Sequence, residues 1–287
     1  LAPFRYPWAW KYFLNANRNH WTPLDINMAQ DVHDYHHRLS AAERHVYENV
    51  LAYLTTSDIL AMRNIGLAVM EKMTAPELQI YQARQVYEEA LHTWTYQHCI
   101  ESIGLDQQEI YNRYRVVPQI HGKIALAQRR LESVMASDFD LKDRDNLHTF
   151  ALSYFFFAVV FEGCWFYNGF TPIFALQRRG LMKGTAEQLQ YILRDESMHC
   201  NFGIDLINTI KLENPHLWTP AFREEVRGLF QRAVELEYAY AEDTMPRGVL
   251  GLNAPMFKSY LRFIANRRAQ QIGLDPMFPQ EENPFPW

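Results

Sequence analysis

Apolar residues recur along most of the chain at the spacing of helices, and few segments carry strand signals. The run Ser40-Ala-Ala-Glu43 is a capping box, which predicts a long helix that begins there and runs toward Met73. Thr74 as a cap and Pro76 as an early proline predict the beginning of the next helix, and Gly104 predicts its end. Similar patterns predict further helices over about 106–114, 118–135, 146–170, 185–212, 219–245 and 255–272.

These elements predict an all-α protein that forms a single domain over residues 1–287. Residues 1–39 are expected to form an N-terminal arm, 138–145 a polar loop, and 283–287 an extended segment. A chain of 287 residues, 48% of them hydrophobic, is long enough to bury one continuous core.

The net charge and the spacing of the cysteines argue against some classes of protein and indicate a compartment. The formal net charge of −5 argues against a general nucleic-acid-binding surface, and no glycine-rich phosphate loop is present. Cys99, Cys164 and Cys200 show no CxxC spacing, which predicts buried, inert thiols in a reducing compartment. We therefore expect a cytoplasmic protein.

No membrane segment is expected. The first residues lack the basic and apolar regions of a signal peptide. The most apolar stretch, 150–161, is about a dozen residues long, whereas a membrane span needs roughly 20. We interpret this stretch as a core helix.

Two copies of Glu-x-x-His carry the candidate chemistry, Glu89-Ala-Leu-His92 and Glu196-Ser-Met-His199. Residues three apart lie on the same face of a helix, so each pair can direct one carboxylate and one imidazole at a common point. Two such helices, with one carboxylate from each of two others, form the dinuclear metal site of ferritin-like helical bundles.

Two single acids complete this set. Asp58 lies in an otherwise apolar helix, and Glu162 interrupts an aromatic run. The four carboxylates carry four negative charges, which two divalent cations would balance; without metal, their burial would cost several kcal/mol each. Mixed oxygen and imidazole ligands favour iron or manganese, and Cys200 is not needed as a ligand. The prediction is a ferritin-like helical bundle with a carboxylate-bridged dinuclear metal site.

Tyr96 lies four residues after His92, one helical turn further along the same face. Phe166, Phe170 and Ile192 could line an apolar pocket around it. A redox-active tyrosine fits this position, and the alternative is a buried tyrosine with an ordinary hydrogen bond.

At these motifs the chain resembles the radical-generating small (beta) subunit of class I ribonucleotide reductase. The family pattern is an acid, Glu-x-x-His-x-x-x-Tyr, a single Glu, and Arg-Asp-Glu-x-x-His. This sequence matches it at Asp58, at Glu89-His92-Tyr96, at Glu162, and at Arg194-Asp195-Glu196-His199. The spacings agree as well, with 31 residues from Asp58 to Glu89 and 34 from Glu162 to Glu196.

The resemblance implies a tyrosyl radical on Tyr96, formed with O2, and an exit path for the oxidising equivalent through Trp21, Asp195 and His92. It also implies a large (alpha) subunit that reduces ribonucleotides to deoxyribonucleotides, and a homodimer of the small subunit. The large subunit would be contacted by a C-terminal tail that would begin where this chain stops, at Trp287.

The metal pair is left open. Segments such as 191–196 resemble a subgroup that uses manganese with iron and lacks the radical tyrosine. Asp58 and Tyr96 depart from that subgroup, which favours the tyrosyl-radical type with two irons, and leaves Mn/Fe and Mn/Mn as alternatives.

The sequence leaves two other functions open as alternatives. A related di-metal oxidase or oxygenase would act on a small molecule in its own pocket, and would need an open apolar channel to the metals. An iron store or interaction scaffold would be a non-catalytic bundle, but storage bundles are usually shorter and the many aromatic residues count against that function.

Overall fold

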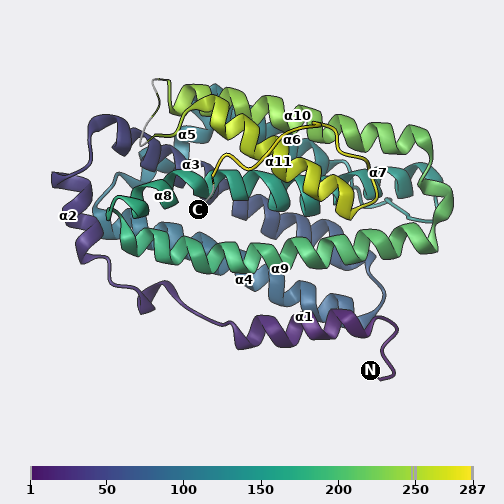
Figure 1. Cartoon of the computed structure of the whole chain (residues 1–287). Coiled ribbons are helices and arrows are strands. Elements are labelled where there is room, and N and C mark those ends of the chain that lie inside the picture. Colours follow the sequence, from purple (N-terminus) through teal and green to yellow (C-terminus); the bar gives the residue numbers. More distant parts are fainter. Residues whose placement is uncertain (1, 247, 249–250, 286–287) are drawn as a thin grey trace.

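Long helices pack side by side around an aromatic core in the computed structural model (Figure 1). It describes residues 2–246, 248 and 251–285, so residues 286–287 of the predicted C-terminal extended segment lie outside the described part. No β-strand occurs in these ranges, and the predicted all-α class is confirmed. The elements in chain order are α1 (Pro7–Arg18), η1 (Pro23–Asp25), α2 (Ala29–His37), α3 (Ala41–Arg63), η2 (Asn64–Val69), η3 (Met70–Lys72), α4 (Pro76–Ile103), α5 (Gln107–Val116), α6 (Pro118–Glu132), α7 (Arg144–Phe155), η4 (Phe156–Trp165), α8 (Phe166–Arg178), α9 (Lys183–Glu213), η5 (Pro215–Leu217), α10 (Pro220–Thr244) and α11 (Ala254–Gln271).

Four of these segments, α3, α4, η4 and α9, surround the centre of the molecule, and α8 continues η4. Helix α3 packs against α4 and α8, while α9 packs against α4, η4 and α8. Helices α10 and α11 cover one side of this group, and α1 runs along α4 and α9 on the opposite side (Figure 1). Side chains from α3, α4, η4 and α9 can therefore meet in the interior.

Local signals explain several helix ends. The Ser40 hydroxyl accepts a hydrogen bond from the backbone N–H of Glu43 at 3.3 Å, and the Glu43 carboxylate accepts one from Ser40 at 2.7 Å. The predicted capping box is thus confirmed at the start of α3. Gly104 ends α4 with φ of 79°, a left-handed conformation that glycine adopts without steric cost. Thr219 caps α10 by accepting from the N–H of Phe222.

The predicted cap at Thr74 is wrong. The residue that precedes α4 is Ala75, and it provides no side-chain hydrogen bond. The first turn instead holds the N-terminal segment, because the Glu77 carboxylate accepts a hydrogen bond from the backbone N–H of Tyr6 at 2.6 Å.

The N-terminal residues, predicted as an arm, form α1, η1 and α2 before the first long helix. The rings of Trp8 and Tyr12 pack on Phe202 of α9, with centroids 5.5 and 5.6 Å apart. Ala9 and Ala16 on α1 are fully buried. These side chains attach α1 to the bundle and thereby fix the chain that follows it.

Two π-helical segments extend the central helices. Segment η2 continues α3, and η4 joins α7 to α8, so the helix predicted over 146–170 runs from Arg144 to Arg178 and passes through Pro172. A π-helix has i→i+5 hydrogen bonds and occurs often at functional sites. Segment η4 carries Glu162, the acid in the aromatic run.

This continuous helix has the length and apolar composition of a membrane span, but 94% of its most apolar window is buried inside the protein. It is a core helix, as predicted. Cys99, Cys164 and Cys200 are buried free thiols, also as predicted.

Candidate metal centre

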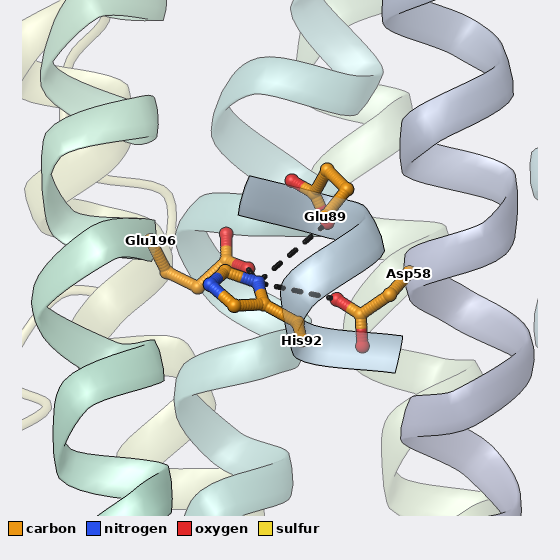
Figure 2. A group of neighbouring side chains, drawn as sticks. All are labelled: Asp58, Glu89, His92 and Glu196. Atoms are coloured by element: carbon orange, nitrogen blue, oxygen red, sulfur yellow. Dashed lines mark ion pairs between the residues drawn. The ribbon is translucent and has the colours of Figure 1, made fainter. Parts of the chain in front are cut away.

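The two Glu-x-x-His pairs and the two single acids converge from four segments. Helix α3 supplies Asp58, α4 supplies Glu89 and His92, η4 supplies Glu162, and α9 supplies Glu196 and His199. The six side chains are at most 3% exposed. Figure 2 shows four of them, with Asp58, Glu89 and Glu196 all directed toward the His92 ring.

The donor atoms form two groups that share two carboxylates. Asp58, Glu89, His92 and Glu196 offer atoms within 4.8 Å of one another, and so do Glu89, Glu162, Glu196 and His199. Glu89 and Glu196 belong to both groups, which is the arrangement of bridging carboxylates.

The oxygens of the shared acids are divided between the two histidines. Nδ1 of His92 lies 3.8 Å from Oε2 of Glu89 and 3.1 Å from Oε1 of Glu196. Nδ1 of His199 lies 3.1 Å from Oε1 of Glu89 and 3.4 Å from Oε2 of Glu196. Each shared carboxylate therefore presents one oxygen to each half of the cluster.

Unpaired polar atoms indicate that the cluster fits metal ions. Within the described residues, both oxygens of Asp58, Glu89 and Glu196 lack a hydrogen-bond partner, as does Nδ1 of His92 and of His199. Burial raises the pKa of Asp58 and of Glu162 well above the ordinary carboxyl range. Buried carboxylates with no donor are costly unless a cation faces them, so this donor set is complementary to two divalent ions.

A second layer of acids orients the histidines. Oδ2 of Asp195 lies 3.4 Å from Nε2 of His92 and accepts a hydrogen bond from Nε1 of Trp21 at 2.8 Å. The predicted contact between Trp21 and Asp195 is therefore present. Arg194 also forms an ion pair with Asp195, in which Nη2 lies 3.3 Å from Oδ1, in addition to these two contacts. A ligating histidine usually donates its other N–H to such an acid.

An acid equivalent to Asp195 lies on the other helix and was not predicted from the sequence. Oε2 of Glu88 lies 3.0 Å from Nε2 of His199, and its Oε1 accepts a hydrogen bond from Arg84 at 3.2 Å. Glu88 directly precedes Glu89, as Asp195 directly precedes Glu196. The same reasoning that selected Asp195 would have found it. Each acid holds the histidine of the opposite helix.

Tyr96 is fully buried, and its hydroxyl has no hydrogen-bond partner in the part of the chain that the structure describes. Burial raises the pKa of Tyr96 well above its ordinary value, and the charge of Asp58 makes the largest further contribution. Phe166, Phe170 and Ile192 are also fully buried. The tyrosine thus lies in the buried core, close enough to the carboxylate cluster for the charges of Asp58, Glu196 and Glu89 to act on it.

Cys200 is not part of the cluster, and the cavity that adjoins the cluster is small. Cys200 follows His199 but is absent from both donor groups found among the described residues. A cavity that borders Glu162 and His199 has a volume of about 10 Å³, which is the size of one water molecule. This cavity is too small for an organic substrate.

A helical bundle that gathers four carboxylates and two histidines from four segments belongs to the class of ferritin-like proteins with a dinuclear metal site. Residues 1–284 match the family model described as ribonucleotide reductase, small chain. The beta subunit of ribonucleoside-diphosphate reductase from Chlamydia pneumoniae is 42% identical over 288 residues, which cover 100% of this chain and 83% of that protein.

Solved structures agree in fold. A class I ribonucleotide reductase from Bacillus halodurans aligns with a TM-score of 0.87 at 23% identity, over 96% of each chain. The dimanganese(II) NrdF protein of Streptococcus sanguinis aligns with a TM-score of 0.80 at 20% identity, over 94% of this chain and 90% of that one. The chain belongs to the ribonucleotide reductase small-chain family.

Membership in this family decides between the functions that the sequence left open. The chain is the small subunit of a ribonucleoside-diphosphate reductase, an oxidoreductase whose partner is the large subunit. The alternative of a di-metal oxidase with its own substrate pocket is not supported.

Proposed function

We propose that this subunit generates an oxidising equivalent at a dinuclear metal site, holds it as a radical on Tyr96, and passes it to the large subunit. Asp58, Glu89 and His92 would hold mainly one ion, and Glu162, Glu196 and His199 mainly the other. Bridging by Glu89 and Glu196 rests on one observation, the division of their oxygens between His92 and His199.

The bound metal pair would supply the redox chemistry that takes electrons to O2. The four carboxylates balance the charge of two divalent ions, and their mixture with imidazole suits iron or manganese. Two irons are the proposed pair, because Asp58 and Tyr96 are the residues of the tyrosyl-radical type. The Streptococcus sanguinis protein carries manganese, so Mn/Mn and Mn/Fe are the outcomes against which iron is tested.

Tyr96 is proposed as the radical residue because it is fully buried and lies close enough to Asp58 for the charge of that carboxylate to act on its hydroxyl. Its phenol would give one electron to the metal pair and its proton to the Asp58 carboxylate, whose charge acts on it. The dry surroundings would then exclude water and reductants from the phenoxyl group, and Phe166, Phe170 and Ile192 contribute buried apolar side chains to this interior.

The exit path is proposed to run through His92, Asp195 and Trp21. Asp195 joins the other two, since its Oδ2 contacts both the imidazole and the indole. Trp21 lies between α1 and η1 and is 6% exposed, whereas Asp195 and His92 are at most 1% exposed, so Trp21 is the least enclosed member of the path. The function further includes a homodimer, docking on the large subunit through a C-terminal tail, and a cytoplasmic location, which three buried free thiols favour.

Metal analysis combined with electron paramagnetic resonance after aerobic reconstitution tests the proposal. We expect two metal ions per chain and a tyrosyl signal that Tyr96→Phe abolishes. The matched control is Tyr81→Phe, because Tyr81 is also fully buried with an unpartnered hydroxyl among the described residues but lies on the His199 side.

Persistence of the signal in Tyr96→Phe, or its loss in Tyr81→Phe, would reject Tyr96 as the radical residue. Unchanged binding of two metals by Glu196→Ala would reject the ligand assignment. A manganese-coupled signal without a tyrosyl component would assign the mixed-metal type.

A further inference from the structure

A second group of buried charges lies away from the metal ligands, between α3, α6, α8 and α10. Lys123 of α6 is fully buried, and its ammonium forms an ion pair with the Glu237 carboxylate of α10. The other oxygen of Glu237 accepts a hydrogen bond from Asn168 at 2.9 Å. Burial lowers the pKa of Lys123 to about 8, so the side chain remains a cation at neutral pH.

Three oxidisable rings surround this ammonium. Nζ of Lys123 lies 3.4 Å from the ring centroid of Tyr53, 4.8 Å from that of Tyr240 and 4.9 Å from that of Trp165. These distances are those of cation–π contacts, which are strongest where water is excluded. We call Lys123 and these three rings the lysine cage.

The lysine cage adjoins the metal-binding segments. Tyr53 lies five residues before Asp58 on α3, and Trp165 lies three residues after Glu162. Burial and then the charge of Glu237 raise the pKa of Tyr53, with a smaller contribution from Asp58, which is the largest charge acting on the pKa of Tyr96. Two fully buried tyrosines therefore lie within electrostatic reach of one proposed ligand.

The two tyrosines differ in the charge that faces their rings. Tyr96 is affected by the carboxylates Asp58, Glu196 and Glu89. Tyr53 has an ammonium over its ring face. Its hydroxyl, like that of Tyr240, has no hydrogen-bond partner in the described ranges, and both oxygens of Glu237 are engaged by Lys123 and Asn168.

We propose that Lys123 directs oxidation to Tyr96 by making the rings of the lysine cage difficult to oxidise. The inference rests on the proposed function, in which one electron passes from a side chain to the oxidised metal site. Removal of an electron from Tyr53, Trp165 or Tyr240 would leave a positive ring in contact with an ammonium, turning attraction into repulsion. A tyrosine must also release its phenolic proton. The Asp58 carboxylate is placed to accept it from Tyr96, whereas Glu237, the carboxylate that acts most on Tyr53, is already engaged by Lys123 and Asn168. Lys123 is thus a positioning residue that acts through neighbouring rings.

The test removes both charges together, so that no unpaired buried ion remains. In Lys123→Met/Glu237→Gln, residue 237 keeps an oxygen that can accept from Asn168. The charge-preserving control is Lys123→Arg. Complete chains of wild type and both variants are loaded with ferrous iron in air. Paramagnetic resonance then measures the Tyr96 signal, and peptide mass spectrometry measures oxidation at each ring of the lysine cage.

We expect the doubly neutral variant to shift oxidation from Tyr96 to the lysine cage by about tenfold in ratio, equivalent to about 1.4 kcal/mol. Lys123→Arg should keep the wild-type ratio. Adding Tyr53→Phe to the neutral variant should move the products to Trp165 and Tyr240, which would identify Tyr53 as the first ring oxidised.

Three results would overturn the inference. One is the same ratio in wild type and the neutral variant, with Tyr96 still oxidised in both; the proposed function would stand and the role of Lys123 would not. Another is an equal shift in Lys123→Arg, since a change independent of charge is a packing effect. The third is a wild-type protein that forms no Tyr96 radical, which would overturn the proposed function as well.

Discussion

At Gly203, two segments that carry proposed metal ligands lie too close together to admit a side chain. Gly203 follows His199 by four residues on α9, and it faces Ala158, which precedes Glu162 by four residues on η4. A Cβ atom at position 203 would lie 2.6 Å from Cβ of Ala158. We predict that Gly203→Ala separates α9 from η4 and weakens the metal site between them.

The magnitude follows from two opposing effects. Alanine is favoured over glycine inside a helix by about 1 kcal/mol. The contact of 2.6 Å is about 1 Å shorter than the optimum of roughly 3.5–4.0 Å between carbon atoms. Overpacking of this kind costs about 1–3 kcal/mol, and the upper part of that range, about 2–3 kcal/mol, applies because Ala158 has no flexible side chain to yield and backbone must move. We expect a net loss of about 1–2 kcal/mol in the free energy of unfolding.

Thermal unfolding of the metal-free chain measures the loss, which should lower the midpoint by roughly 2–5 °C. Metal titration should show weaker binding of the ion held by Glu162 and His199. Gly228→Ala is the matched control, because Gly228 is an exposed residue inside α10 and its added Cβ would meet no described atom within 4 Å. That variant should be stabilised by about 0.5–1 kcal/mol. If both variants were stabilised equally, a Cβ at position 203 would not collide with Ala158, and the prediction would be wrong.

Three further outcomes are expected. Lys123→Met alone should destabilise the chain by about 3–5 kcal/mol in urea unfolding, because it leaves the buried Glu237 carboxylate without its partner; a loss below about 1 kcal/mol would contradict a buried ion pair. Ser40→Ala should cost about 1 kcal/mol in the same assay, since it removes the cap of α3, and an unchanged midpoint would argue against the cap. Trp21→Phe and Asp195→Asn should still bind two metals but lose most nucleotide reduction when a version with the C-terminal tail is mixed with the large subunit; near-normal turnover in either would remove that residue from the exit path.

The cluster of carboxylates and histidines was largely predictable from the sequence, because spacing along a single helix decides which of its side chains lie on the same face. Glu89 and His92, like Glu196 and His199, lie three apart, and helical geometry alone puts each pair on one face. Asp58 stood out as an acid in an apolar helix. Only the resemblance selected Trp21, since nothing local relates a tryptophan in the N-terminal region to an aspartate 174 residues away.

Other features depend on packing between helices and were not predictable. Lys123 occupies a position that periodicity cannot distinguish from a solvated lysine, and its burial follows from the meeting of α6 with α10. The π-helical segments η2 and η4 have no sequence signature that separates them from α-helix. The helices α1 and α2 are short, so their stability comes from contacts with the bundle, such as that of Trp8 with Phe202.

A ribosome releases α3 and α4 well before α9, because 104 residues separate His92 from Glu196. The growing chain therefore carries Asp58, Glu89 and His92 without the Glu196 that completes their donor group, and without the Asp195 that holds the histidine. An ion that meets the unfinished chain finds half a site and can leave again. In the proposed function, tight metal capture consequently waits for α9 to pack, so that loading of the metal pair follows the assembly of the four segments that carry the donor atoms.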